Sequence, residues 1–304
     1  MSLLSRIKRP GPSGFGYSST AEEVTRGLDL TSRNILLTGC SSGLGMETLR
    51  VLASRGATVL GTARSESKAN EACARATGQT VPLACDLAEP ASVRACIEQV
   101  KGRGSALDVI ICNAGIMAPP RLEQAYGYEL QFFTNHVGHF MLVTGLLPLL
   151  AENGRVVIVS SDAHRRTPRG GIELDNLSGA RGYNPWRAYG QSKLANLLFA
   201  RELKNRLPRP GQRANALHPG VISTNLFRNM PAWAQAGFSA LAPLALKSIP
   251  EGAATQCYLA TQPEVRANGE YFKDCNITTS SRFGRDLRLA ARLWETTEQI
   301  VRKL

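Results

Sequence analysis

From Asn34 to Val159 the chain alternates short apolar runs with longer segments of helical pattern. The apolar runs are bounded by Gly, Pro, Asp or Asn, as buried parallel strands are. The runs expected to be strands are Asn34–Leu37, Thr58–Thr62, Thr80–Cys85, Val109–Cys112 and Arg155–Val159. The segments expected to be helices are Gly43–Ser54, Glu66–Ala76, Ala91–Lys101 and a long stretch that ends at Leu149 and can break in two. This alternation predicts an α/β fold.

Strands that alternate with helices form a doubly wound (Rossmann) parallel sheet with helices on both faces. The chain has 304 residues, which is enough for one large α/β domain or two average ones. The sequence contains no internal repeat and no interdomain linker, so we expect a single domain over residues 34–304. Residues 1–33, which are rich in Gly, Pro and Ser near their start, are expected to form an N-terminal arm.

Charge and hydropathy bear on which classes of protein are expected. The net charge is +12, but no stretch interleaves basic with aromatic residues, so nucleic-acid binding is not expected. The longest apolar run, Met141–Ala151, falls short of the ~20 residues that a membrane span needs. The seven cysteines form no CxxC pair or Cys/His cluster, which favours reduced thiols and a cytoplasmic location. Peripheral contact with a membrane and a homo-oligomer stay open.

A glycine-rich turn follows the first expected strand. The sequence TGCSSGLG runs from Thr38 to Gly45 and opens the first expected helix. Glycines permit a tight turn and let the backbone approach a pyrophosphate, whose charge then lies at a helix N-terminus. Taken alone, the segment is also compatible with a plain strand–helix turn. The residues expected to contact a dinucleotide here are Gly39, Ser41, Ser42, Gly43, Leu44 and Gly45.

Tyr189 and Lys193 are four residues apart, which places both side chains on one face of a helix. Reduction of a carbonyl needs a proton donor beside the oxygen, and a free tyrosine has a pKa of about 10. The Lys193 ammonium, close to the ring, would lower the pKa of Tyr189. Ser161 follows the fifth expected strand, at the edge where α/β sheets bind ligands, and its hydroxyl can bond a substrate oxygen. A Tyr-xxx-Lys spacing is often accidental, and this context favours the catalytic interpretation.

These motifs occur in a definite order along the chain. They are TGCSSGLG, CNAG (112–115), Asn135, Ser161, YGQSK (189–193) and Pro219-Gly220. This order resembles that of the short-chain dehydrogenase/reductase family over residues 30–280. The segments NHVGHF (135–140), NALHPG (215–220) and GEYFKDC (269–275) resemble its retinol-dehydrogenase and WW-domain-oxidoreductase branch.

Two features depart from the common family pattern. Cys112 stands where the family usually has the first Asn of NNAG, a change that is frequent in this branch. The separation of Ser161 and Tyr189 is 28 residues, longer than is common in the family. The intervening segment 164–186 resembles an insertion of this branch and is expected to be rich in loops and to shape the pocket.

The resemblance implies a catalytic set and further cofactor contacts. Tyr189 is implied as the acid/base and Lys193 as its partner and as a ligand of the nicotinamide ribose. Ser161 is implied to bind the substrate oxygen, and Asn135 to break a helix and hold a water that leads from the lysine. The other residues implied at the cofactor are Asp86, Leu87, Asn113, Ala114, Gly115, Pro219, Gly220, Val221 and Thr224.

The end of the second expected strand bears on the type of cofactor. In NAD-dependent members of the family, a carboxylate at this place accepts hydrogen bonds from the adenosine ribose and would repel a 2′-phosphate. Here Ala63 takes that place and Arg64 follows it, and a guanidinium can give a phosphate two parallel charge-assisted bonds. The resemblance therefore implies NADP(H). A purely structural surface role for Arg64 and an N-cap role for Asp86 are the alternatives.

Other catalytic classes are not expected. The four histidines, at positions 136, 139, 164 and 218, form no metal-ligand pattern, so we expect no metal and assign them core or surface roles. The chain also lacks the GxSxG sequence of many serine hydrolases.

The expected function is that of an NADP(H)-dependent oxidoreductase that interconverts a carbonyl and an alcohol. Segment 221–250 is rich in apolar residues, and in the family it lies over the active site, so we expect a hydrophobic substrate, such as a retinoid-like, steroid-like or long-chain compound or a secondary metabolite. Packing on the core or on another subunit, and contact with a membrane, are alternative roles for the segment. Two other functions stay open: non-redox lyase or cyclase chemistry, and a nucleotide-binding regulatory protein without turnover.

Overall fold

The computed structural model describes residues 9–222 and 246–304. Within these ranges, one sheet has the strand order β10-β9-β8-β7-β4-β1-β2-β3. Its parallel strands are β1 (Asn34–Thr38), β2 (Thr58–Ala63), β3 (Thr80–Ala84), β4 (Leu107–Cys112), β7 (Leu150–Val159), β8 (Arg213–His218) and β9 (Tyr271–Lys273), and β10 (Asn276–Ile277) is antiparallel to β9. Because the strand order reverses between β1 and β4, the fold has a switch point where such sheets bind ligands.

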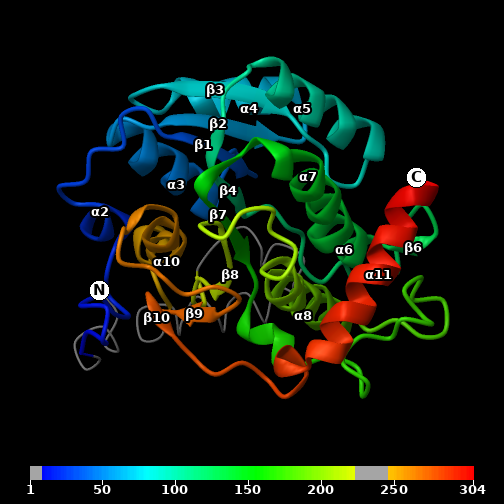
Figure 1. Ribbon diagram of the computed structural model, residues 1–304. Helices are drawn as coiled ribbons and strands as arrows, with labels where there is room; N and C mark the ends of the chain where they lie inside the picture. The colour runs from blue at the N-terminus through cyan, green and yellow to red at the C-terminus, as the bar shows by residue number, and fades with distance from the viewer. Residues whose placement is uncertain (1–8, 223–245) are drawn as a thin grey trace.

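Helices cover both faces of the sheet (Figure 1). One face packs against α2 (Ala21–Val24), α3 (Gly43–Ser54), α4 (Glu66–Ala74) and α10 (Ile249–Thr261). The other packs against α5 (Pro90–Gly102), α7 (Gly138–Leu146) and α8 (Pro185–Leu203), with α11 (Leu287–Lys303) packed against α8. Side chains of a strand alternate between faces, so Ile35 and Leu37 enter the first core and Leu36 the second. The expected doubly wound α/β fold is confirmed.

The five expected strands and the first three expected helices are present, with small shifts at their ends. The largest shift is in β7, which begins at Leu150 and not at Arg155. Leu150 pairs with Leu107, and the register then shifts before Arg155 pairs with Val109. This irregularity lets the strand start early, which hydrophobic pattern alone does not indicate.

The long stretch before Leu149 is broken into several pieces. It contains a hairpin of β5 (Gln124–Ala125) and β6 (Tyr128–Glu129), followed by the short helix α6 (Leu130–Phe132). A π-helical turn, η1 (Phe133–Val137), then leads into α7, and a 3₁₀ turn, η2 (Leu147–Leu149), ends the stretch. Such π-helical turns inside α-helices often occur at functional sites.

The described part of the expected N-terminal arm packs on the domain. Helix α2 contributes the fully buried Ala21 and Val24 to the core that includes α10. Gln262 donates a 2.5 Å hydrogen bond to the Val24 carbonyl, and Arg55 forms a 2.6 Å ion pair with Glu22. The division of the chain at residue 34 stays a prediction. No helix in the described part of the chain is long and apolar enough to cross a bilayer.

Candidate active site

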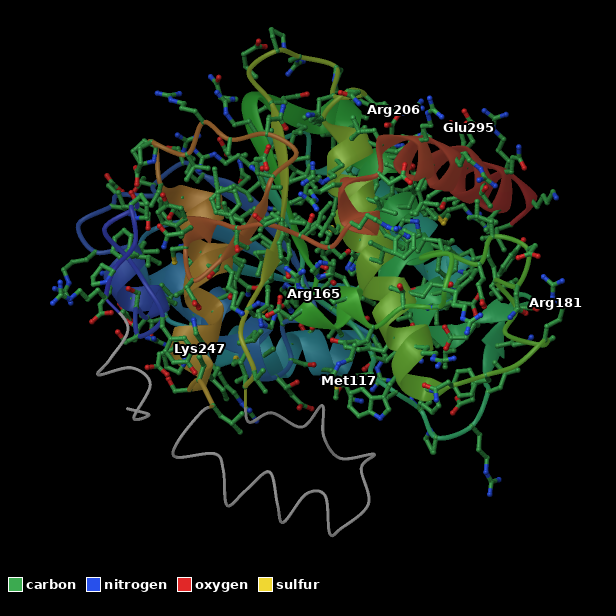
Figure 2. The ribbon with its side chains drawn as sticks, turned by 90° about the horizontal axis from the view of Figure 1, so that it is seen from below. Met117, Arg165, Arg181, Arg206, Lys247 and Glu295 are labelled. Carbon is green, nitrogen blue, oxygen red and sulfur yellow. The ribbon has the colours of Figure 1, made fainter. Side chains whose placement is uncertain are left out.

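A pocket of about 1760 Å³ lies at the carboxyl ends of the parallel strands. Its walls include residues that directly follow β1, β2, β4, β7 and β8. Further walls come from the segment after β4 and from η3 (Asp162–Arg165), a 3₁₀ turn after β7. In Figure 2, Met117 and Arg165 mark these two segments. The pocket therefore occupies the position that the switch point of the sheet predicts.

The structure brings nearly all of the sequence-predicted residues to this one pocket. Asn135 lies behind the wall, fully buried, and Thr224 falls outside the described residues. The predicted residues that line the pocket are Gly39, Ser41, Ser42, Gly43, Leu44, Gly45, Arg64, Asp86, Leu87, Asn113, Ala114, Gly115, Ser161, Tyr189, Lys193, Pro219, Gly220 and Val221.

The glycine turn after β1 is packed too closely for larger residues. Gly39 has φ +73°, and a Cβ there would lie 2.9 Å from the Ala114 Cα. A Cβ on Gly45 would overlap the Gly39 carbonyl oxygen. The Asn113 side chain donates to the Thr38 carbonyl at 2.8 Å, so the ends of β1 and β4 are tied together. The turn thus presents compact backbone at the start of α3, as a pyrophosphate site requires.

Tyr189 and Lys193 lie one turn apart on α8, and both are at least nine-tenths buried. The Lys193 Nζ lies 5.7 Å from the centre of the Tyr189 ring and donates to the Val159 carbonyl at 3.1 Å. The Ser160 hydroxyl donates to the Lys193 carbonyl at 2.6 Å. The end of β7 therefore fixes the turn of α8 that carries Tyr189 and Lys193 against the sheet.

Ser161 is the N-cap of η3, and its side chain is oriented toward Tyr189. Its Oγ accepts a 3.1 Å hydrogen bond from the Ala163 N–H, which leaves the hydroxyl hydrogen for donation. A hydrogen bond from Ser161 acts to lower the pKa of Tyr189. The two hydroxyl groups can therefore bond the same carbonyl oxygen.

Burial dominates the electrostatics of the pair. It raises the pKa of Tyr189 to about 12, against the smaller lowering by Ser161. It also lowers the pKa of Lys193 to about 8. The surroundings that the protein supplies therefore act against the expected lowering of the tyrosine pKa, because both charged forms lose solvation in this apolar environment.

Asn135 lies in the π-helical turn and holds the segment after β4. Its Oδ1 accepts from the Ile116 N–H at 2.8 Å, and its Nδ2 donates to the Ile116 carbonyl at 3.0 Å and to Ser192 Oγ at 2.9 Å. A Cβ on Gly115 would lie 3.1 Å from Asn135 Oδ1 and 3.4 Å from Lys193 Nζ. Asn135 thus lies close behind the lysine, while its side chain is engaged by protein groups.

Sequence reasoning missed two basic residues near Arg64. Lys68 and Arg75 on and after α4 also line the pocket, and all three cationic side chains are exposed. Their spacing of seven residues puts Lys68 and Arg75 on one face of a helix, so the signal was present in the sequence. With Glu71 between them, they extend the basic wall that begins at Arg64.

The segment after CNAG was also missed as a pocket wall. Met117, Pro119 and Pro120 line the pocket. Gln131 Oε1 accepts from the Ala118 N–H at 2.7 Å, and the Tyr183 hydroxyl donates to the Pro119 carbonyl at 2.7 Å. These contacts join residues that are 13 and 64 positions apart in the sequence, so no local pattern predicts them.

A buried ion pair supports the pocket wall that Pro219 and Gly220 form. Lys247, labelled in Figure 2, lies 2.6 Å from Asp274 and 4.8 Å from the Tyr17 ring centre, and its side chain is 1% exposed. Gly220 has φ +102°, and a Cβ there would lie 2.6 Å from Lys247 Cδ. The ion pair therefore lies directly behind the Pro219-Gly220 wall. Within the described residues, no group of three or more His, Cys, Asp or Glu side chains is placed to hold a metal ion.

Comparison with known proteins identifies the class. A sequence profile described as short chain dehydrogenase matches residues 33–235. With the fold and the pocket described above, this match shows that the chain belongs to the short-chain dehydrogenase/reductase family, whose members bind nicotinamide dinucleotides. The expected family is thereby confirmed.

Curated relatives also confirm the expected branch. The chain is 40% identical to the short-chain dehydrogenase TIC 32 B, chloroplastic, of Brassica napus, over 97% of each chain. It is 35% identical to human retinol dehydrogenase 14, over 98% of this chain and 90% of that protein. A crystal structure of a Mycobacterium paratuberculosis protein is 35% identical, with a TM-score of 0.76 over 92% of this chain and 97% of the other.

We predict that Gly39→Ala weakens dinucleotide binding roughly tenfold or more, because the new methyl group pushes the turn away from Ala114. The matched control is Gly14→Ala. Gly14 has a similar φ of +79°, but a Cβ there meets no atom within 4 Å. Both variants should lose about 1–2 kcal/mol in stability, because alanine disfavours the positive φ. Fluorescence titration with cofactor and thermal unfolding measure the two effects, and equal loss of affinity in both variants would contradict the prediction.

Proposed function

We propose that this protein is an NADP(H)-dependent oxidoreductase that interconverts a carbonyl and an alcohol on a hydrophobic small molecule. The observation that carries the proposal is a single pocket that joins Ser161, Tyr189 and Lys193 to the glycine turn and to Arg64. A site for a dinucleotide and a proton-transfer pair at one sheet edge fit hydride transfer coupled to protonation of an oxygen.

In this proposal Tyr189 is the acid/base. The nicotinamide supplies or accepts the hydride when bound, and Tyr189 gives the oxygen its proton in reduction or removes it in oxidation. Ser161 donates to the same oxygen and stabilises the developing negative charge. Because burial raises the pKa of Tyr189 to about 12, the tyrosine is protonated near neutrality, as carbonyl reduction requires. Lys193, beside the ring, stabilises the phenolate left after the proton has moved.

The basic wall supports NADP(H) as the cofactor. The buried Ala63 ends β2 without a carboxylate, and Arg64, Lys68 and Arg75 follow it on the pocket wall. Arg64, at the place expected for the adenosine ribose, favours a 2′-phosphate over a free hydroxyl, and Lys68 and Arg75 add positive charge to the same pocket.

The remaining walls support a hydrophobic substrate. Apolar side chains line the pocket from five segments. They are Ile116, Met117, Pro119, Pro120, Leu130, Trp186, Val221, Ile222, Leu246 and Ile249. Pockets with apolar walls and a few convergent polar groups are typical of sites for apolar small molecules.

The cellular compartment and the oligomeric state stay predictions. The cysteines favour a cytoplasmic location, whereas one relative is named as chloroplastic. All seven cysteines are free and buried.

One assay distinguishes the proposed function from non-redox chemistry and from a regulatory role without turnover. It measures the oxidation of NADPH with a panel of aldehydes and ketones.

We predict that Tyr189→Phe lowers kcat by roughly 10²–10⁴-fold while NADPH still binds, because the phenyl ring fills the same space and cannot transfer a proton. Tyr258→Phe, at a buried tyrosine of α10 that does not line the pocket, is the control. NADPH absorbance gives kcat, and fluorescence titration gives the dissociation constant. Retention of a tenth of the original kcat by Tyr189→Phe would rule out the acid/base role.

We predict a preference for NADP(H) that depends on Arg64. Loss of its contact to the 2′-phosphate should cost about 1.5–3 kcal/mol, or roughly 10- to 100-fold in KM for NADPH. The double variant Ala63→Asp with Arg64→Leu should favour NADH. The control is Arg103→Leu, which removes an exposed cation that does not line this pocket, and it should change neither the KM for NADPH nor the cofactor preference. Equal kcat/KM for NADPH and NADH in the unmodified protein would contradict this prediction.

We predict that kcat/KM rises with chain length over a series of linear aldehydes. Each buried CH₂ should add about 0.8 kcal/mol of binding until the pocket is full. Met117→Ser, which replaces an apolar wall residue by a small polar one, should flatten the rise. A falling series, with small polar carbonyls reduced best, would show that the apolar walls do not serve substrate binding.

A further inference from the structure

We propose that His164 is a positioning residue that sets the place of Ser161 through one fixed neutral tautomer. The proposal rests on the proposed function, since Ser161 is the residue it positions. His164 is fully buried in η3, three residues after Ser161. Its Nδ1 lies 2.6 Å from the Ser161 carbonyl oxygen, and its Nε2 accepts a 3.0 Å hydrogen bond from the Ser281 N–H.

The two partners determine the protonation state of the ring. A carbonyl oxygen can only accept, so Nδ1 must carry a hydrogen. A backbone N–H can only donate, so Nε2 must be free of hydrogen. The imidazole is therefore neutral with its hydrogen on Nδ1, and it bridges the catalytic serine to the segment that follows β10. In a cationic ring, the Nε2–H group would face the Ser281 N–H, and two donors cannot form a hydrogen bond.

The surroundings of the ring are consistent with a rigid neutral group. The Tyr271 ring from β9 packs edge-on at 4.9 Å between ring centres. Burial lowers the pKa of His164, and Arg165 acts in the same direction, while Asp162 and the bond to Ser161 oppose them. Asp162 is in turn paired with Lys273, whose Nζ lies 2.6 Å from the Asp162 Oδ2.

A second histidine, His218, contacts Asp162, the residue after Ser161, and has the opposite tautomer. The Asp162 N–H donates to His218 Nδ1 at 3.3 Å, so the hydrogen of a neutral His218 is on Nε2, 3.3 Å from Asp162 Oδ2. Burial lowers the pKa of His218 to about 4. The backbone at Ser161 and Asp162 is therefore held between two neutral imidazoles with opposite tautomers.

The position of η3 matters because this turn rests on the catalytic helix. A Cβ on Gly190, next to Tyr189, would lie 2.7 Å from the Ala163 carbonyl oxygen. The Ala163 N–H is also the donor to Ser161 Oγ. A displacement of the turn would move the Ser161 hydroxyl relative to the Tyr189 hydroxyl, and small misplacements of catalytic groups are costly in rate.

Two substitutions separate positioning from packing. His164→Phe keeps a ring against Tyr271 and removes both hydrogen bonds, and it should lower kcat roughly 10- to 100-fold. The dissociation constant of NADPH should stay within about twofold, since its site lies elsewhere in the pocket. His164→Asn restores a short N–H donor for the Ser161 carbonyl and should recover most of the lost kcat. Ser281→Ala is the matched control, because it keeps the backbone N–H that donates to His164 and removes only the hydroxyl that accepts from the Gly284 N–H, and it should keep kcat within about twofold.

A selective ¹⁵N-histidine NMR spectrum of the unmodified chain tests the tautomers without turnover. The proposal expects a neutral His164 with hydrogen on Nδ1 and a neutral His218 with hydrogen on Nε2. A hydrogen on Nε2 of His164 would overturn the proposal whatever the activity. So would a kcat of His164→Phe above half of the original, or equal losses in His164→Phe and His164→Asn. A chain that shows the expected tautomers but no turnover with any carbonyl would instead overturn the proposed function.

Discussion

The close approach of β1 and β4 at their carboxyl ends is the constraint on which the rest of the site depends. The Thr38 hydroxyl, fully buried, accepts from the N–H groups of Asn113 at 2.9 Å and Ala114 at 3.0 Å. Gly39 then has to pass Ala114 with no room for a side chain. Of these residues, Gly39, Asn113 and Ala114 line the proposed dinucleotide site, and their contacts fix where the segment after β4 begins.

That junction is also linked to the proposed catalytic residues. His139 Nδ1 lies 2.9 Å from the Asn135 carbonyl, so its Nε2 can accept the Thr38 hydroxyl hydrogen at 2.8 Å. The Asn135 side chain continues the connection to Ser192, next to Lys193. Buried polar groups of this kind hold a unique arrangement only when each is paired, and here Thr38, His139 and the Asn135 side chain are. The π-helical turn at Asn135 is therefore part of one hydrogen-bonded unit that reaches from β1 to α8.

The sequence predicted what local pattern determines. Buried strands, the glycine turn and the Tyr189–Lys193 spacing are set by neighbours within a few residues, so they were visible. The pinning of the segment after β4 by Gln131 and Tyr183, and the Lys247–Asp274 pair, depend on contacts over long separations and were not. Helix α11 was a different case, because the buried Leu289, Leu293 and Ile300 repeat with helical spacing that could have been recognised.

The back of the site is built by the last part of the chain. Asp274 and Cys275 adopt left-handed backbone conformations, with φ of 52° and 63°, in the turn between β9 and β10. Non-glycine residues hold such conformations only where their surroundings impose them. Here Asp274 is paired with Lys247 behind Gly220, and Lys273 is paired with Asp162 beside Ser161. Lys273 and Asp274, which are adjacent, thus support both the proposed cofactor wall at Gly220 and the turn that follows Ser161. Ser281 contacts His164 a few residues further on, so in the proposed mechanism the geometry of proton transfer depends on a segment that carries none of the proposed catalytic groups.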